Sequence, residues 1–282
     1  MNVRAVKGKI KSFGNVKKIT NAMQMVSAVK MKKAQVAATE AKPYQEFLER
    51  AISRMSTNMD KQHSTLLQVA TEGAKKKLVI LITSNKGLCG SFNFNVMRFL
   101  LQNNKDQELD FVAVGKKGAS MAASLRKNVL ADFSSNVPIN STSAVFDFVL
   151  DEYMKGMYSS VSVVYNRFIS SLKSETVEEI LLPFSMKMTE EDAPQNEYMI
   201  EPDPAQLVES LLKNFIEEKI RFAIMQNEAG EHSARMIAMK NATDNAGELI
   251  GSLTQLSNKL RQQKITSELL DMVTAKESVE ST

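Results

Sequence analysis

The sequence predicts an α/β fold with two parts: an antiparallel coiled coil of long N- and C-terminal helices, and a small central α/β domain with a mainly parallel sheet. Residues 205–282 contain no proline and repeat apolar residues every three or four positions. The first 60 residues show the same helical period. Between these segments, short apolar runs alternate with helical patterns, which is typical of a parallel sheet with crossover helices.

The N-terminal segment, residues 1–60, is predicted to form one arm of the coiled coil. Its apolar residues make a continuous stripe, which we expect to be buried against a partner helix. Pro43 lacks a backbone N–H, so the helix is expected to kink or restart there. The stripe consists of Val3, Val6, Ile10, Phe13, Val16, Ile19, Met23, Val26 and Val29.

The central segment, residues 74–190, is predicted to be the α/β domain. Apolar runs followed by turn residues indicate buried strands, and the stretches between the first three runs have helical period. The predicted strands are 78–82, 109–114, 161–165 and 179–184, and the predicted helices are 93–102, 117–125 and 143–157.

The C-terminal segment, residues 203–275, is predicted to form the second arm. Asp203 suits a helix N-cap and Pro204 suits the first helical position. About 70 helical residues span ~105 Å, whereas a compact chain of this length has a radius of gyration of about 19 Å. Such a helix cannot be buried in its own domain, so we expect it to act as a lever, strut or axle. The polar ending after Met272 is expected to fray or protrude.

The charge distribution supports pairing of the two ends. Residues 1–42 carry ten basic residues and one acidic residue, whereas residues 197–282 carry a net charge of −5. Oppositely charged helical segments attract each other, which favours an antiparallel pair. Lysine predominates over base-reading arginine in the basic segment, and no aromatic platform for stacking bases is present, so we expect no nucleic-acid partner.

The strand-to-helix loop 83–90 lies where α/β proteins bind phosphates, but it does not contain the glycine, lysine and serine or threonine spacing of a phosphate loop. The lone Cys89 lacks a nearby histidine in the sequence, since the chain has only His63 and His232. We therefore expect no catalytic residues, no cofactor and no metal. An enzyme that binds a phosphorylated ligand at 87–90 is kept as an alternative.

Three stretches together resemble one family. Residues 18–34 (KITNAMQMVSAVKMKKA) resemble the N-terminal helix of F-type ATP synthase gamma subunits, and residues 83–93 (TSNKGLCGSFN) are similar to the signature after the first strand of their globular domain. Residues 231–247 and 261–269 look like parts of their C-terminal helix. The resemblance covers essentially the whole chain in the right order.

The resemblance implies a central rotor shaft. In that family the coiled coil stands inside a hexamer of alpha and beta subunits, and the α/β domain sits on the c-ring beside an epsilon-type subunit. Ion flow turns the ring and the coil, which drives the catalytic beta subunits through their conformations for ATP synthesis, and the reverse reaction pumps ions. One copy per complex is implied, with membrane association through the c-ring only.

The resemblance also implies contact residues. Residues that would contact beta subunits are Met23, Lys30, Lys32, Lys33, Arg261, Gln262 and Thr266. Residues that would contact the c-ring are Tyr198 and Glu201, although Ile200 replaces a common aromatic residue beside them. The expected location is the cytoplasmic face of a bacterial inner membrane, with the matrix side of a mitochondrial inner membrane as the second choice. A structural coiled-coil adaptor with an α/β head, unrelated to ATP synthesis, is the alternative function.

Overall fold

The computed structural model describes residues 3–56, 76–104, 107–135, 137–184 and 204–280. They divide into two compact units, 1–27 with 236–282 and 28–235. The terminal helices α1 (Val3–Ser56) and α5 (Pro204–Glu280) contribute to both units. As predicted, α5 begins at Pro204, whereas Asp203 lies outside the described residues.

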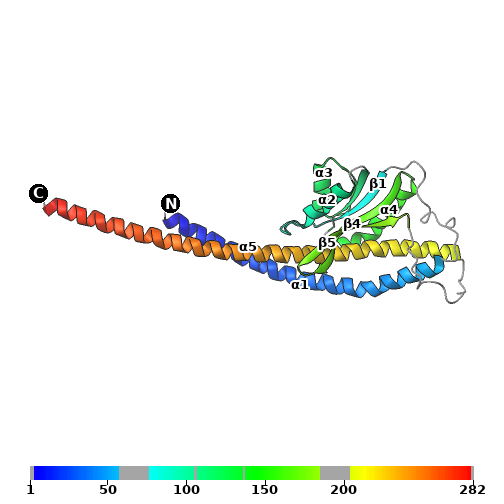
Figure 1. Cartoon of the computed structure of the whole chain (residues 1–282), viewed down its shortest axis with the longest axis horizontal. Coiled ribbons are helices and arrows are strands. Elements are labelled where there is room, and N and C mark those ends of the chain that lie inside the picture. Colours follow the sequence, from blue (N-terminus) through cyan, green and yellow to red (C-terminus); the bar gives the residue numbers. More distant parts are fainter. Residues whose placement is uncertain (1–2, 57–75, 105–106, 136, 185–203, 281–282) are drawn as a thin grey trace. The chain divides into compact units, whose positions relative to one another are not determined.

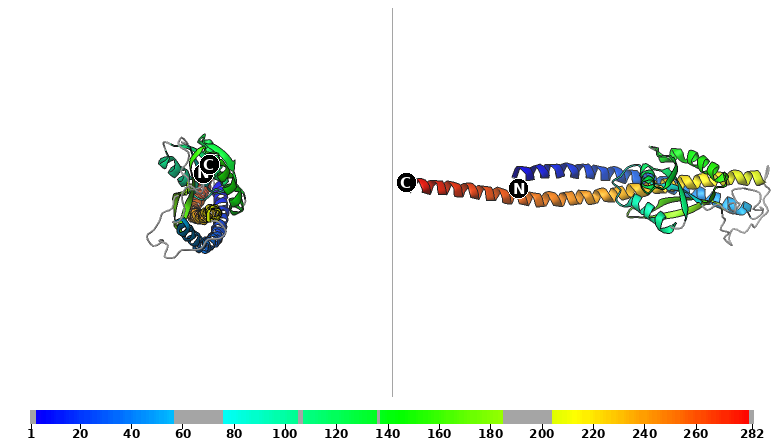
Figure 2. Two further views of the ribbon diagram at one scale, coloured as in Figure 1. Left: turned by 90° about the vertical axis from the view of Figure 1, so that its right-hand side faces the viewer. Right: turned by 90° about the horizontal axis from the view of Figure 1, so that it is seen from above.

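The first unit is an antiparallel pair of helical segments (Figure 2). The hydroxyl oxygens of Thr20 and Thr243 are 2.7 Å apart, and Lys17 Nζ lies 3.1 Å from the position that a Cβ on Gly247 would take. The residue number falls on one helix as it rises on the other, so the two segments run in opposite directions. The same register places Val6 opposite Ser257, and both are buried.

The seam of this pair differs from the predicted apolar stripe, so the expectation that the whole stripe is buried was wrong. Val6, Thr20 and Ser27, which lie at multiples of seven residues on α1, are buried, whereas Ile19 and Val26 are 60% and 57% exposed. A close pair of helices buries positions at a spacing of 3.5 residues, so residues on the flanks of that seam stay at the surface. Two of the seam residues are small polar residues, which a search for apolar stripes does not detect. The other members of the stripe left exposed are Val16 and Val29.

The second unit contains a five-stranded sheet in the order β3-β2-β1-β4-β5. Strands β1 to β4 are parallel, and β5 pairs antiparallel with β4. The predicted fold class is therefore confirmed. The strands are β1 (Lys76–Ile82), β2 (Glu108–Val114), β3 (Asn128–Asp132), β4 (Tyr158–Ser170) and β5 (Lys173–Leu182).

Helices cover both faces of this sheet (Figure 1). On one face, the α2 residues Val96 and Leu100 and the α3 residue Ala122 pack against Val79 and Leu81 of β1. On the other face, α4 residues join residues of α1 and α5 over β1, β2 and β4. The crossover helices are α2 (Phe92–Asn103), α3 (Lys116–Ser124) and α4 (Thr142–Met154), with a 3-10 turn η2 (Pro138–Ser141) before α4.

Helix α1 continues through Pro43 without a break, so the predicted restart does not occur. The turns after Pro43 are anchored by tertiary contacts: Gln45 Nε2 donates to the Glu218 carbonyl of α5, and Leu48 and Ile52 are buried in the core. These contacts offset the cost of a proline inside a helix, which is ~3 kcal/mol. Helix α5 likewise continues beyond Met272 to Glu280, where the sequence predicts fraying.

Among the described residues, no helix contains a stretch long and apolar enough to span a bilayer.

Candidate functional site

The basic residues proposed for contact lie on the surface of α1. The side chains of Lys30, Lys32 and Lys33 are exposed, and Met23 is half-buried. Beside these lysines, Val29 is 72% exposed. An exposed surface that combines apolar and basic side chains on a helix is suited to binding another protein with an acidic surface.

The C-terminal part of α5, residues 261–276, is exposed at every position. It contains the three predicted contact residues Arg261, Gln262 and Thr266. Thr266 Oγ1 donates to the Gln262 carbonyl at 3.0 Å, so this hydroxyl is engaged by its own helix. The same segment leaves five large apolar side chains at the surface: Ile265, Leu269, Leu270, Met272 and Val273.

Tyr198 and Glu201, the residues predicted to contact the c-ring, lie outside the described residues.

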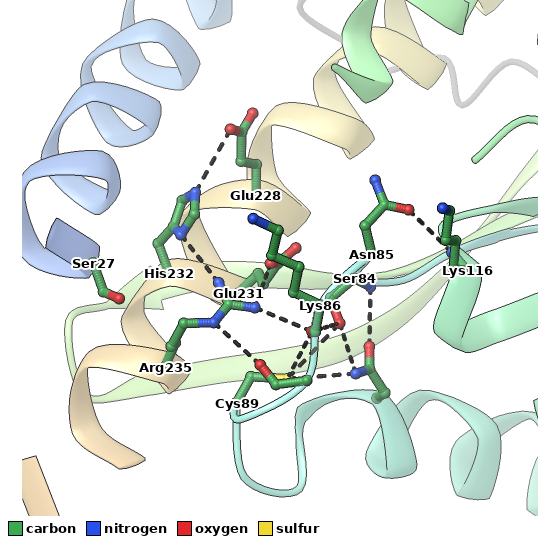
Figure 3. Close-up of polar contacts among 12 residues, drawn as sticks. Ser27, Ser84, Asn85, Lys86, Cys89, Lys116, Glu228, Glu231, His232 and Arg235 are labelled. Carbon is green, nitrogen blue, oxygen red and sulfur yellow. Dashed lines mark hydrogen bonds and ion pairs between the residues drawn. The ribbon is translucent and has the colours of Figure 1, made fainter. Parts of the chain in front are cut away.

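The loop after β1 is closed by its own hydrogen bonds (Figure 3). Asn93, in the first turn of α2, accepts from the Ser84 backbone N–H at 3.0 Å and donates to Ser84 Oγ at 2.8 Å. Ser84 Oγ donates to the Lys86 carbonyl at 2.7 Å. Cys89 is buried and packs within this turn, 3.4 Å from Asn93 Nδ2. A phosphate loop presents free backbone N–H groups to its ligand, whereas here the Ser84 N–H is already bound to Asn93.

Arg235 of α5 seals this loop from the other side (Figure 3). Its guanidinium donates to the carbonyls of Lys86 at 3.1 Å and Gly87 at 3.3 Å. It also pairs with Glu231 at 2.6 Å, and its side chain is only 9% exposed. A planar guanidinium has five donors in a fixed geometry, so it can bind carbonyls and a carboxylate at the same time. Arg235 therefore joins the loop to α5, and Glu231 balances its buried charge.

His232 extends the cluster toward Glu228. Arg235 Nη1 lies 3.3 Å from His232 Nδ1, and because arginine can only donate, Nδ1 must be the acceptor. The ring proton is then on Nε2, which lies 3.7 Å from Glu228 Oε1. Interaction with His232 lowers the pKa of Glu228 against the opposing effect of burial, and the positive charges of Lys30 and Lys33 lower it further.

The hydrogen bonds of this arrangement join the loop after β1 to α5. Carbonyl oxygens point at an arginine, and the buried thiol of Cys89 has no histidine within the contacts that the structure describes. Among the described residues, no group of three or more histidine, cysteine or acidic side chains could hold a metal ion.

Arg235 was not among the residues predicted from the sequence, although its spacing from Glu231 is a recognisable signal. Glu231 and Arg235 are four residues apart on a predicted helix, which is the spacing of a helical ion pair. Their burial, and the loop that they contact, depend on a tertiary contact that a single sequence does not reveal.

The fold defines a class of proteins in which a doubly wound α/β domain is inserted, in sequence, between two long pairing helices. The ATP synthase family model matches residues 2–279 of the chain. Proteins described as ATP synthase gamma chain are 37% identical in Burkholderia lata, over 96% of this chain and 97% of theirs, and 38% identical in Paraburkholderia phytofirmans with the same coverage. The chain belongs to the ATP synthase gamma chain family.

Solved structures agree with this assignment at the level of fold. The rotor of the Euglena gracilis mitochondrial ATP synthase superposes with a TM-score of 0.67 at 19% identity, covering 93% of this chain and 98% of that chain. A chain of the central stalk and c-ring of the Tetrahymena thermophila mitochondrial ATP synthase gives a TM-score of 0.59 at 23% identity, covering 79% and 99%.

Proposed function

We propose that the chain is the central rotor shaft of an F-type ATP synthase, which couples ion-driven rotation of a c-ring to conformational change in catalytic beta subunits. ATP synthesis results, and ATP hydrolysis drives the reverse rotation and ion pumping. The chain itself supplies no catalytic residue and acts as one copy per complex.

The observation that carries the proposal is the exposed C-terminal part of α5. A helix that leaves Leu269, Leu270 and Met272 at the surface is suited to binding an apolar surface supplied by other proteins. A family match over 278 residues, which includes this segment, supports the proposal that the hexamer of alpha and beta subunits supplies this surface.

The residue-level assignments follow from this placement. Arg261, Gln262 and Thr266 would bind beta subunits from α5, with Arg261 pairing to a carboxylate. Met23, Lys30, Lys32 and Lys33 would bind them from α1, where lysine provides charge without the forked geometry of arginine.

The remaining partners are the epsilon-type subunit and the c-ring, the latter through Tyr198 and Glu201. Contact with the c-ring is the only membrane association, on the cytoplasmic face of a bacterial inner membrane. The curated relatives come from bacteria such as Burkholderia lata, which favours this location over the mitochondrial matrix side. The proposed domain boundaries are an N-terminal coiled-coil helix at 1–60, a central α/β domain at 74–190 and a C-terminal coiled-coil helix at 203–275.

The test combines purification with a double substitution. A tagged chain should co-purify with ATPase alpha and beta subunits and a c-ring. Arg261→Ala with Gln262→Ala should lower ATP synthesis in membrane vesicles without unfolding the chain, since both side chains are exposed. Arg98→Ala with Gln102→Ala, two exposed residues of α2 outside the proposed contact surfaces, is the matched control. Unchanged synthesis in the double variant would contradict the contact assignment.

A coiled-coil adaptor unrelated to ATP synthesis is the competing function. It would give a stable chain that co-purifies with other proteins and leaves ATP synthesis intact when the chain is depleted.

A further inference from the structure

Side chains of helix α5 bind the part of β4 that extends beyond the end of β1. The parallel pairing of β1 with β4 ends where Leu81 meets Val164, but β4 continues to Ser170. Beyond that point, the backbone N–H groups of Asn166 and Phe168 have no β1 residue to bind. They donate instead to side chains of α5, Asn166 to Asn227 Oδ1 at 3.2 Å and Phe168 to Gln226 Oε1 at 3.1 Å.

Asn166 is the centre of this joint. Its side-chain amide donates to the Phe92 carbonyl of α2 at 3.1 Å and accepts from Thr176 Oγ1 of β5 at 2.7 Å. The side chain is 2% exposed. One residue of β4 therefore connects α2, β5 and α5.

A glycine brings α5 close to this centre. A Cβ added to Gly230 would lie 3.1 Å from Phe92 Cε2 and 3.5 Å from the Asn166 carbonyl oxygen. A larger residue at this position would therefore press on the Phe92 ring of α2, next to the contact of α5 with β4. Three residues further on, Ser233 Oγ donates to the Ser171 carbonyl at 2.5 Å.

The joint occupies the position at which doubly wound sheets bind ligands. In the order β3-β2-β1-β4-β5, the chain moves from β1 to one side and later returns to the other, so the switch point lies between β1 and β4. Ligands of such folds bind outside the carboxyl ends of the strands at this point. Here α5 is bound there, through Gln226 and Asn227 at β4 and Arg235 at the loop after β1.

We propose that this joint, made by Gln226, Asn227, Gly230, Ser233 and Arg235, is the connection that transmits torque between the α/β domain and α5. The inference rests on the proposed rotor function. We call this set of residues the α5 clamp. Its members are positioning residues, since they hold two parts of the chain in register and touch no reacting group.

Transmission of torque between the α/β domain and α5 requires directional bonds. The apolar contacts of Leu212, Ile216 and Ile220 with the sheet stabilise the docking of α5. Apolar contact has no preferred direction, so it resists separation better than sliding or rotation. Hydrogen bonds depend steeply on distance and angle, and a buried N–H that loses its acceptor is costly, so the clamp opposes any small twist of α5 against β4.

The test uses paired substitutions at Gln226, which is only half-buried and therefore tolerant of change. Gln226→Met keeps the length of the side chain and removes the acceptor, whereas Gln226→Glu keeps an acceptor oxygen. Asn214→Ala, an exposed amide on the same helix, is the control. Each variant is assembled in the complete ATP synthase in membrane vesicles, where ATP hydrolysis and ATP-driven ion pumping are measured together.

We expect Gln226→Met, alone or with Asn227→Ala, to lower the ions pumped per ATP hydrolysed severalfold at an unchanged hydrolysis rate, and Gln226→Glu to restore most of the ratio. Amide exchange at Phe168 should quicken about tenfold in Gln226→Met and stay near the wild-type rate in Gln226→Glu.

Two results would overturn the inference: an unchanged pumping ratio in a variant whose Phe168 amide exchanges faster, or an unchanged exchange rate in Gln226→Met. The proposed function fails in a different way, because a wild-type chain that is not a rotor would be absent from the complex.

Discussion

Replacing Arg235 by alanine should destabilise the second unit of the chain by about 3 kcal/mol. The change removes the donor for two backbone carbonyls and leaves Glu231 as an unpaired carboxylate. Breaking a buried ion pair by removing one partner costs 3–5 kcal/mol, to order of magnitude. The lower end of that range applies because the Glu231 side chain is 16% exposed and keeps some contact with water.

The assay is urea unfolding of the full chain, followed by the near-ultraviolet circular dichroism of tyrosine. Three of the five tyrosines, Tyr153, Tyr158 and Tyr165, are buried in the core of the second unit, and the chain has no tryptophan. Since the amount of surface exposed on unfolding should not change, the variant should shift the midpoint and leave the slope unaltered.

Arg221 provides the matched control. It also pairs with two glutamates of α5, Glu217 at 3.3 Å and Glu218 at 2.9 Å, but it is 34% exposed. Exposed pairs within a helix contribute about 0.3–0.5 kcal/mol, so Arg221→Ala should cost less than 1 kcal/mol. The stability of Arg235→Lys should fall between those of the two alanine variants, because lysine keeps the positive charge but lacks the planar set of donors of the guanidinium. If Arg235→Ala lowers the free energy of unfolding no more than Arg221→Ala does, the buried ion pair does not stabilise the second unit as predicted.

Two further predictions concern pH and glycine. Burial is the largest single effect on the pKa of Glu178 and would raise it, but the hydrogen bonds from Lys77 and Ser162 and the charge of Lys77 together outweigh burial, so the pKa lies below the ordinary 4.5. The ionised pair therefore stabilises the fold above about pH 4.5, and this stability is lost as the pH falls through the lowered pKa. In Lys77→Met the buried carboxyl has no cation, so stability should rise as the pH falls. The assay is the urea midpoint at several values from about pH 3 to about pH 7, and a pH dependence of the same sign as in the wild type would contradict the prediction. On α5, Gly251→Ala should stabilise the free chain by roughly 1 kcal/mol, because no atom lies within 4 Å of the new Cβ. Gly230→Ala should instead destabilise it by about 1 kcal/mol, because the new Cβ would press on buried Phe92. Equal thermal shifts in these two variants would contradict the close approach of α5 to α2.

The sequence contains enough information for the class of fold, and the reason is periodicity. The apolar runs at β1 and β2 are buried on both faces, so they are almost continuously apolar and easy to recognise. Strand β3 was missed because it lies at the edge of the sheet, where Val129, Leu130 and Ala131 are only half-buried between Asn128 and Asp132.

The β4–β5 hairpin shows what periodicity misses. Its apolar part, 161–165, was predicted, but β4 extends to Ser170 and β5 begins at Lys173 among polar residues. Those polar residues are held by ladder pairing and by ion pairs such as Arg167 with Glu179 at 2.8 Å. Pairing of this kind depends on the partner strand, so it leaves little trace in either segment alone.

The candidate site was predicted unevenly for the same reason. Arg261, Gln262 and Lys30 stay predictions from the resemblance, and the structure shows that all three are exposed. The α5 clamp could not be named, because Asn227 and Asn166 are 61 residues apart and meet only when α5 docks beyond the end of β1.

The central claim is that neighbouring proteins surround the exposed end of α5. Backbone hydrogen exchange across residues 261–276, compared between the free chain and the assembled complex, tests it most directly. We expect fast exchange in the free chain, because every residue of this segment is exposed, and strong protection in the complex. Equally fast exchange in both states would contradict it.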